Sequence, residues 1–202
     1  MTERFGPDLY AWLAAIAPAE RDAAIERELG IDALVSTAPP GEHLVGHHMT
    51  GIAALVRALH EIPVRPDDRV LDVGAGLGKV ALLTHLFTGA AVRGIEVQRE
   101  LALRAPSCPG VRIEHGDART ASLEDASVIL LYCPFEGPVL EEMSRRFDAL
   151  EDVVVCALGV DLRCRRLRAR PSDSFWSTIW DAGPPRAPLT LAGDARRIAL
   201  EI

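Results

Sequence analysis

Three glycines follow an acidic residue near the middle of the chain, in a pattern that can hold a ligand. The segment 70–79 (VLDVGAGLGK) places Gly74, Gly76 and Gly78 between an apolar strand and a helical run. Glycine lets the backbone turn sharply and lets a ligand approach the main chain, because no Cβ stands in the way. Open parallel sheets bind their ligands at this end of a strand. The spacing therefore predicts a ligand site at this turn.

Two carboxylates narrow the kind of ligand. Asp72 lies two residues before the first glycine, and Glu96 ends the next apolar strand. A carboxylate at the end of the second strand can accept hydrogen bonds from both ribose hydroxyls of a nucleoside. Asp72 would repel a diphosphate, so a ligand with an adenosine, a sulfonium and an amino acid group fits better than a dinucleotide. The plainer alternative is that Asp72 caps the following helix and that Glu96 is a solvated strand end.

The elements that must position these residues alternate between short apolar strands and helical runs. This alternation predicts an α/β fold, with a parallel sheet covered on both faces and right-handed crossovers. We expect strands at 69–73, 92–96, 111–115, 126–131 and 153–158, and helices at 78–88, 98–105 and 137–150.

The two ends of the chain depart from this alternation. Residues 174–181 and 195–202 look strand-like around a Gly/Pro-rich connection, which predicts an antiparallel hairpin at one sheet edge. The N-terminal part is apolar at helical spacing, and Thr50 is placed to N-cap a further helix. We expect an N-terminal helical cap at 1–50 that sets specificity, and the main domain at 51–202. The alternative for the cap is simple packing on the outer helices of the sheet.

These motifs resemble those of a known family. Segment 72–78 (DVGAGLG) resembles the first motif of class I S-adenosylmethionine-dependent methyltransferases, 94–96 (GIE) the second and 116–118 (GDA) the third. The resemblance covers residues 47 to about 160. It implies a Rossmann-like seven-stranded, mostly parallel sheet with an antiparallel C-terminal hairpin and helices on both faces. It also implies S-adenosylmethionine as cofactor, held by Thr50, Asp72, Gly74, Ala75, Gly76, Gly78, Glu96, Val97, Asp117, Ala118 and Tyr132.

The fourth motif would face the methyl acceptor. The turn at 131–138 (LYCPFEGP) is similar to the Tyr-Asn-Pro-Phe turn of small bacterial methyltransferases, and loosely to that of non-SET histone-lysine methyltransferases. It departs from both at Cys133, where the asparagine would stand. Pro134 should keep Cys133 extended. We expect Tyr132 and Phe135 to form the floor beneath the transferred methyl, where an aromatic face attracts a cation. A packed turn without substrate contact is the alternative.

Histidines just before residue 50 could supply a base. His43, His47 and His48 lie where the resemblance places a segment over the methionine end of the cofactor, and a histidine near neutral pKa could take a proton from the nucleophile. Adjacent residues of an extended segment point to opposite sides, so one of the pair at 47 and 48 faces the pocket. We take His48 as the catalytic candidate. A solvent-facing cluster is the plainer interpretation.

The composition and net charge of the chain limit the kinds of partner and the cellular location that we expect. The net charge is −7, whereas tight nucleic-acid binders carry a basic footprint, so we expect no nucleic-acid partner. The arginine-rich run at 163–170 is interpreted as a solvated strand edge. We expect no membrane segment, because no apolar run approaches about 18 residues, and no export signal. The four cysteines lack paired spacing, which favours reduced thiols in the cytoplasm and no metal site.

The sequence thus predicts a bacterial methyltransferase that moves a methyl group from S-adenosylmethionine to a nitrogen or oxygen atom of a small molecule or a protein side chain. Two alternatives stay open. One is a cofactor-binding module without activity that serves a partner protein. The other is an NAD-dependent dehydrogenase, which is disfavoured because 202 residues leave little room for a second domain and Lys79 is the sole lysine.

Overall fold

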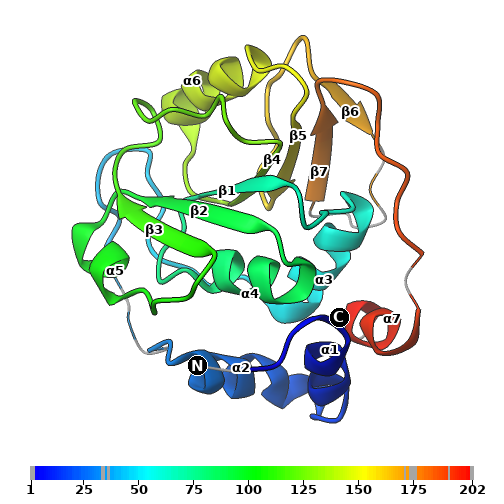
Figure 1. Ribbon diagram of the computed structural model, residues 1–202. Coiled ribbons are helices and arrows are strands. Elements are labelled where there is room, and N and C mark those ends of the chain that lie inside the picture. Colours follow the sequence, from blue (N-terminus) through cyan, green and yellow to red (C-terminus); the bar gives the residue numbers. More distant parts are fainter. Residues whose placement is uncertain are drawn as a thin grey trace.

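Seven strands form one sheet over the described part of the computed structural model, which comprises residues 3–32, 35, 37–170, 172, 177–190 and 192–200 (Figure 1). The strands are β1 (Arg69–Val73), β2 (Ala91–Glu96), β3 (Val111–His115), β4 (Val128–Tyr132), β5 (Val154–Leu158), β6 (Arg168–Arg170) and β7 (Ser177–Asp181). Their order is β3-β2-β1-β4-β5-β7-β6. The first five are parallel, and β7 runs antiparallel to both neighbours. The predicted fold class is confirmed.

The helices predicted at 78–88, 98–105 and 137–150 are present, with ends shifted by one or two residues, and further helices lie toward both ends of the chain. The helices are α1 (Gly6–Ala14), α2 (Arg21–Leu29), α3 (Ile52–Glu61), α4 (Lys79–Thr88), α5 (Arg99–Arg104), α6 (Gly137–Asp148) and α7 (Gly193–Leu200), with a 3₁₀ turn at Pro18–Glu20. Gly30 and Gly89 end α2 and α4 in the left-handed conformation that glycine favours. Among the described residues, no helix is long and apolar enough to span a membrane.

Two apolar cores sandwich the sheet. Helix α6 covers one face, where Met143 and Phe147 pack on the side chains of β1, β4 and β5. The other face is covered by α3 and α4, and α1, α2 and α7 form a further layer beneath them (Figure 1). Strands of such a sheet are buried on both faces, which explains their near-continuous apolar runs.

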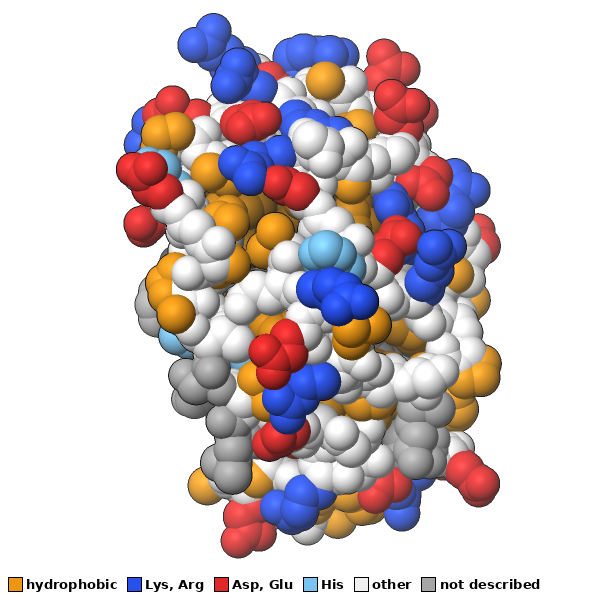
Figure 2. Space-filling model, turned by 90° about the vertical axis from the view of Figure 1, so that its left-hand side faces the viewer, with side chains coloured by type: hydrophobic (Ala, Val, Ile, Leu, Met, Phe, Trp, Pro, Cys, Tyr) orange, Lys and Arg blue, Asp and Glu red, His pale blue; other side chains and the backbone are white. Residues whose placement is uncertain are grey.

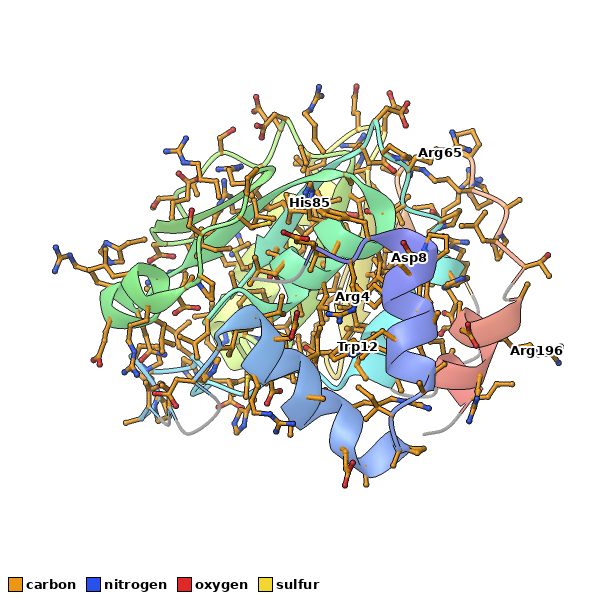
Figure 3. The ribbon with its side chains drawn as sticks, turned by 60° about the horizontal axis from the view of Figure 1, so that its bottom comes forward. Arg4, Asp8, Trp12, Arg65, His85 and Arg196 are labelled. Carbon is orange, nitrogen blue, oxygen red and sulfur yellow. The ribbon has the colours of Figure 1, made fainter. Side chains whose placement is uncertain are left out.

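The N-terminal helices pack mainly on other helices. Helix α1 contacts α4 and α7, and Arg4 lies 5.0 Å from the ring centre of Trp12 on the surface of this layer (Figure 3). The chain then crosses to the carboxyl ends of the strands, where the backbone N–H of Val45 donates to the carbonyl of Pro134 at 3.1 Å. The cap predicted for residues 1–50 thus comprises a helical layer and a strap at the sheet edge, and its role in specificity stays a prediction.

The C-terminal hairpin is present, but its second strand is not the expected one. β7 pairs with β6, and the strand expected at 195–202 is wrong over its described part because 193–200 form α7. Three small or apolar side chains recur at helical spacing there and are buried: Ala195, Ile198 and Ala199. The edge of β7 is taken by β6, where Arg170 pairs with the buried Asp181 at 2.9 Å. Residues 174–176 and 201–202 lie outside the described part.

The predicted N-cap of α3 is also wrong. Gly51 is the N-cap residue, and Asp22 of α2 accepts the hydrogen bond from the backbone N–H of Ile52 at 2.9 Å. Thr50 instead lies buried, and its hydroxyl has no hydrogen-bond partner in the described structure. The carboxylate of Asp22, thirty positions away in the sequence, therefore caps the helix in place of the predicted Thr50.

Asp22, whose side chain is 44% exposed, takes part in an ionic cluster with the buried Lys79 and Glu26. The Lys79 ammonium, 4% exposed as a residue, donates to Asp22 at 2.6 Å and to Glu26 at 2.5 Å. Since Lys79 is the first residue of α4, the cluster ties α2 to the glycine turn and, through Asp22, to the start of α3. Burying such charges is unfavourable unless each keeps its partner.

We expect Lys79→Met to destabilise the fold by about 3–5 kcal/mol, because Glu26 is left as an unpaired buried carboxylate. Urea unfolding measures the change. The control Arg104→Ala breaks exposed pairs with Asp32 and Glu100 and should cost less than about 1 kcal/mol. Adding Glu26→Gln to Lys79→Met should recover part of the loss. Equal stability of Lys79→Met and wild type would show that the cluster does not hold these helices.

Candidate active site

The glycine turn packs tightly against the turn after β4. Gly74, Gly76 and Gly78 have φ values of 78°, 54° and 81°, which residues with side chains rarely adopt. A Cβ on Gly74 would lie 2.6 Å from Cβ of Pro134, so only glycine permits this approach. The first and fourth motifs therefore meet at one edge of the sheet.

Glu96 is buried at the end of β2 and held by backbone amides. Its two carboxylate oxygens accept hydrogen bonds from the N–H groups of Gly76 and Gln98, each at 2.8 Å. Each oxygen keeps a second lone pair, which can accept a further hydrogen bond. The alternative of a solvated strand end does not hold, because Glu96 is 5% exposed and lines a cavity.

Two adjoining cavities lie above the carboxyl ends of the strands. The larger encloses about 660 Å³, part of it open to solvent, and the smaller about 300 Å³. Of the predicted site residues, the larger is lined by His48, Gly74, Glu96, Val97, Asp117, Ala118, Tyr132 and Phe135. The smaller is lined by His48, Thr50, Asp72, Gly74, Ala75 and Tyr132. Gly76 and Gly78 line neither cavity but form part of the glycine turn beside them.

Three polar atoms around the smaller cavity are buried without a hydrogen-bond partner in the described structure. They are the Oδ2 atom of Asp72, the Oγ1 atom of Thr50 and the Nε2 atom of His47. Unpaired buried polar atoms are costly, and they are uncommon in folded proteins. Because all three border one cavity, a polar ligand that supplies both donors and acceptors fits them.

Burial governs the protonation of this region. It raises the pKa of Asp72 to about 7, with a further rise from the charge of Glu96, although the backbone N–H of Ala81 hydrogen-bonds to the carboxyl. Burial also lowers the pKa of His47, and His48 adds to the effect. A cation beside Asp72 would favour its ionised form. The region thus favours a positively charged group over an anion.

His47 is a site residue that the sequence did not single out. Its ring lies over the glycine turn, since a Cβ on Gly76 would come within 2.6 Å of its Cε1 and Nδ1 atoms. His48, the predicted catalytic residue, is exposed and lines both cavities. The sequence predicted that one of His47 and His48 faces the pocket. Only the packing on Gly76 in the folded protein shows that His47 is the more enclosed.

The turn after β4 differs from the prediction at one residue. Cys133 has a φ of 42° and is not extended. Asparagine adopts this left-handed conformation more readily than most residues. This fits the similar turns, which have an asparagine where this chain has Cys133. The thiol donates to the carbonyls of Leu158 and Gly159 at 3.3 and 3.2 Å, which stabilises the turn. Tyr132 is half-buried between the cavities, whereas Phe135 is buried against Leu44 and Val139.

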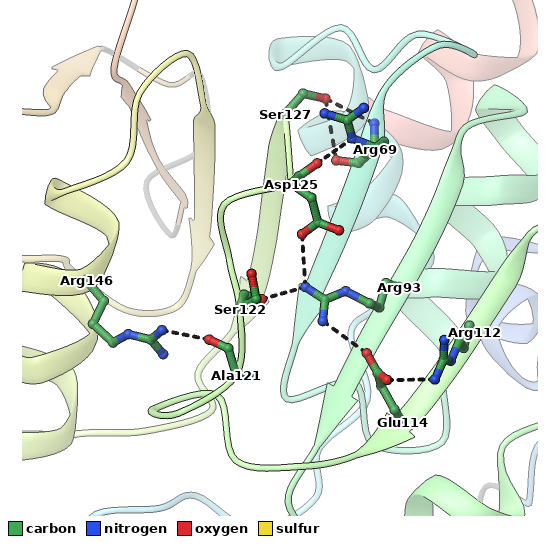
Figure 4. Close-up of polar contacts among 9 residues, drawn as sticks. All are labelled: Arg69, Arg93, Arg112, Glu114, Ala121, Ser122, Asp125, Ser127 and Arg146. Atoms are coloured by element: carbon green, nitrogen blue, oxygen red, sulfur yellow. Dashed lines mark hydrogen bonds and ion pairs between the residues drawn. The ribbon is translucent and has the colours of Figure 1, made fainter.

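Two arginines hold the connection that carries Asp117 and Ala118. Arg146 of α6 donates to the carbonyl oxygens of Ala118 and Ala121, the latter at 2.7 Å, and Arg93 donates to the carbonyl of Ser122 at 2.6 Å (Figure 4). Residues 116–127 contain no helix or strand, so these bonds replace the packing that a crossover helix would supply. No local sequence pattern could have identified Arg146, because its partners are far away in the chain.

Asp117 itself is already paired. Arg119 donates to both carboxylate oxygens, with the shortest bond at 2.6 Å, and this pairing lowers the pKa of Asp117. Both residues line the larger cavity beside Ala118. The adenine role that the resemblance gives to Asp117 stays a prediction.

The raised pKa of Asp72 predicts a stability that falls as the pH rises. The folded protein holds this proton up to about pH 7, and the unfolded chain loses it near pH 3.8, so raising the pH between them favours unfolding. Urea unfolding from about pH 5 to about pH 8 should show a shallower decline for Asp72→Asn, by up to about 1 kcal/mol per pH unit. The difference between the two slopes isolates Asp72, since His47 titrates in both proteins. The exposed Asp125→Asn should leave the slope unchanged, and parallel slopes for all three proteins would contradict the assignment.

Comparison of the sequence with known proteins finds relatives that are named as methyltransferases. No protein-family model matches the chain. A ribosomal RNA small subunit methyltransferase A from Synechococcus sp. (strain CC9605) is 30% identical over 149 residues, which are 66% of this chain and 54% of the relative. The protein of the same name from Prochlorococcus marinus (strain MIT 9303) is 29% identical over 147 residues, which are 66% and 52%. The chain spans about half the length of the curated relatives it matches.

These names contradict one prediction. The sequence led us to expect no nucleic-acid partner, and that expectation is wrong, because the relatives are named for an RNA substrate. It rested on the net charge, which sums the whole surface and ignores where the charges lie. On the face that carries α5 and β3, for instance, acidic and basic side chains alternate around apolar hollows (Figure 2).

Structural comparison settles the fold. The RNA methyltransferase from Salinibacter ruber, solved in complex with S-adenosyl-L-homocysteine, matches with a TM-score of 0.57 at 23% identity. The match covers 72% of this chain and 100% of the Salinibacter chain. The chain therefore has the Rossmann-like fold of class I S-adenosylmethionine-dependent methyltransferases.

Proposed function

We propose that this protein binds S-adenosylmethionine and transfers its methyl group to a nitrogen or oxygen atom of RNA. The observation that carries the proposal is the unpaired Oδ2 oxygen of Asp72, which borders the smaller cavity together with two further unpaired polar atoms. An amino acid moiety next to a sulfonium supplies the charges and hydrogen bonds that these atoms lack.

The lining residues fit the rest of the cofactor. Glu96 can accept hydrogen bonds from the ribose hydroxyls through its remaining lone pairs while keeping the amides of Gly76 and Gln98. Val97 and Ala118 offer apolar walls for an adenine in the larger cavity. Thr50 and His47 would complement the amino acid carboxylate, and Asp72 the ammonium or the sulfonium. When bound, this cofactor supplies an electrophilic methyl group.

The acceptor would meet the methyl group at Tyr132, which lines both cavities. Its ring can hold a cation or stack on a planar acceptor, and Phe135 supports the same turn from the core. His48 is exposed at this place and can take up a proton that leaves the nucleophile. Positioning and exclusion of water account for most of such a rate enhancement. The subfamily suggested by the fourth motif and a cytoplasmic location stay predictions.

RNA is the favoured acceptor because of the relatives. The curated proteins that match about two thirds of this chain are named ribosomal RNA methyltransferases, and the Salinibacter protein with the same fold is named an RNA methyltransferase. The shared part covers the glycine turn and the strands that form the cavities. These names support RNA over the small molecule or protein side chain expected from the sequence.

We expect Glu96→Ala to lower the affinity for S-adenosylhomocysteine by about 10- to 100-fold, because a charged acceptor of two hydroxyls is lost and two backbone amides lose their partner. Isothermal titration calorimetry measures the change. Glu114→Ala, which removes a carboxylate from the neighbouring strand outside both cavities, is the matched control. Unchanged affinity in Glu96→Ala would rule out the ribose role.

The activity itself is tested by incubating the protein with S-adenosylmethionine labelled in the methyl group and total bacterial RNA. We expect label in RNA and not in DNA or protein. Tyr132→Phe should lower the rate at least about tenfold with little change in cofactor affinity, because the hydroxyl orients the acceptor. Leu103→Ala, an exposed change on α5, should leave both unchanged. Label in protein but not in RNA would overturn the RNA assignment, and absence of label from every acceptor would favour the inactive module.

A further inference from the structure

The connection from β5 to β6 starts at the active-site cavity and runs along α6. It leaves β5 at Gly159, where a Cβ would overlap the sulfur of Cys133, and Cys133 lines the larger cavity. It ends at the edge strand β6. The connection therefore leads from the cavity to the opposite edge of the sheet, since Arg168 and Val154, the first residue of β5, both pair in register with Asp181.

Helix α6 fixes the backbone of this connection. Ser144 accepts a hydrogen bond from the N–H of Arg163 at 3.0 Å. The carboxylate of Asp148 accepts three more, from the N–H groups of Arg165 at 3.0 Å, Arg166 at 2.6 Å and Leu167 at 2.8 Å. Leu162 and Leu167 are buried in the core on the α6 side of the sheet. The arginine side chains thus project from a backbone that is already ordered.

We call Arg165, Arg166 and Arg168 the arginine ridge. All three residues are exposed, and the described structure gives their side chains no hydrogen bond or ion pair. The nearby Arg163 has only an exposed pair with Glu141 at 2.9 Å, which is weak in water. Asp148 accepts hydrogen bonds from the three backbone N–H groups, and its charge also interacts with Arg166. By contrast, Arg93, Arg119, Arg146 and Arg186 are all bonded to carboxylates or carbonyls.

We infer that the arginine ridge binds the phosphate backbone of the RNA acceptor at the end of α6 that lies away from the cavity, so that a long RNA contacts the protein at both places. This inference rests on the proposed function. Exposed guanidinium groups on an ordered backbone match phosphate oxygens without an ordering cost for the loop. The net charge of −7 does not oppose this, because charges farther than about 8 Å are largely screened at physiological salt.

The test compares two triple variants of the full chain. The ridge variant is Arg165→Ala, Arg166→Ala and Arg168→Ala. The control variant, Arg27→Ala, Arg104→Ala and Arg196→Ala, removes the same charge from exposed positions on α2, α5 and α7. A fluorescently labelled single-stranded RNA of mixed sequence is titrated with each protein over a range of salt concentrations. Calorimetry with S-adenosylhomocysteine checks that the cofactor site is intact.

We expect the ridge variant to bind RNA at least about tenfold more weakly, with the slope of log K against log salt reduced by about 2, as three lost phosphate contacts require. The control variant should keep nearly the wild-type slope, and both should bind S-adenosylhomocysteine as wild type does. Equal RNA binding by the two variants overturns the inference, as does equally tight binding of a polyglutamate peptide to wild type. Failure of the proposed function shows separately, as absence of methyl label from RNA in a protein whose RNA binding still depends on the ridge.

Discussion

The buried ammonium of Lys79 is the interaction on which the rest of the site depends. It joins two carboxylates of α2 to the first residue of α4, directly after the glycine turn, and one of these carboxylates also caps α3. The strap that carries His47 and Thr50 leads into α3, so its position follows from the same cluster. In the interior, where water does not screen charges well, such a cluster tolerates little displacement. The N-terminal layer is thereby built into the cofactor site, although most of it lies away from the cavities.

The sequence predicted the central sheet well because local residues, such as glycines and short apolar runs, mark where its strands and helices begin and end. Apolar runs ending at Val73, Glu96 and Leu131 are strands in the structure, and Gly89 directly follows the helix predicted at 78–88. The last element was misread because a short segment with two or three apolar residues fits either period. Helix α7 forms because α1 and α3 offer it an apolar surface, which no local pattern records.

The residues of the candidate site likewise fall into those that the sequence could predict and those that it could not. Residues that act through the backbone geometry of a motif, such as Gly74 and Glu96, could be predicted from the sequence, and they lie at the cavities or the turn. Residues that act through a distant partner could not. Asp22 takes the capping role given to Thr50, Arg146 holds Ala118, and the packing on Gly76 decides which histidine is enclosed. Cys133 adopts a positive φ, and both its backbone N–H and its thiol hydrogen-bond to the end of β5, a distant contact that the preference set by the following proline does not record.

Helix α6 has contacts of different kinds on its two flanks. On one flank Arg146 holds the wall of the cofactor cavity, and on the other Ser144 and Asp148 hold the connection to β6. These contacts fall within the last turns of one helix of 12 residues, about 18 Å long, and a single helix of this length is a stiff body. Two ligands that each restrict such a body share the entropic cost of restricting it, so the first to bind makes the second bind more tightly, and by thermodynamic reciprocity the order does not matter. Because α6 holds both sides in place, ligands bound at the two sides would influence each other through it.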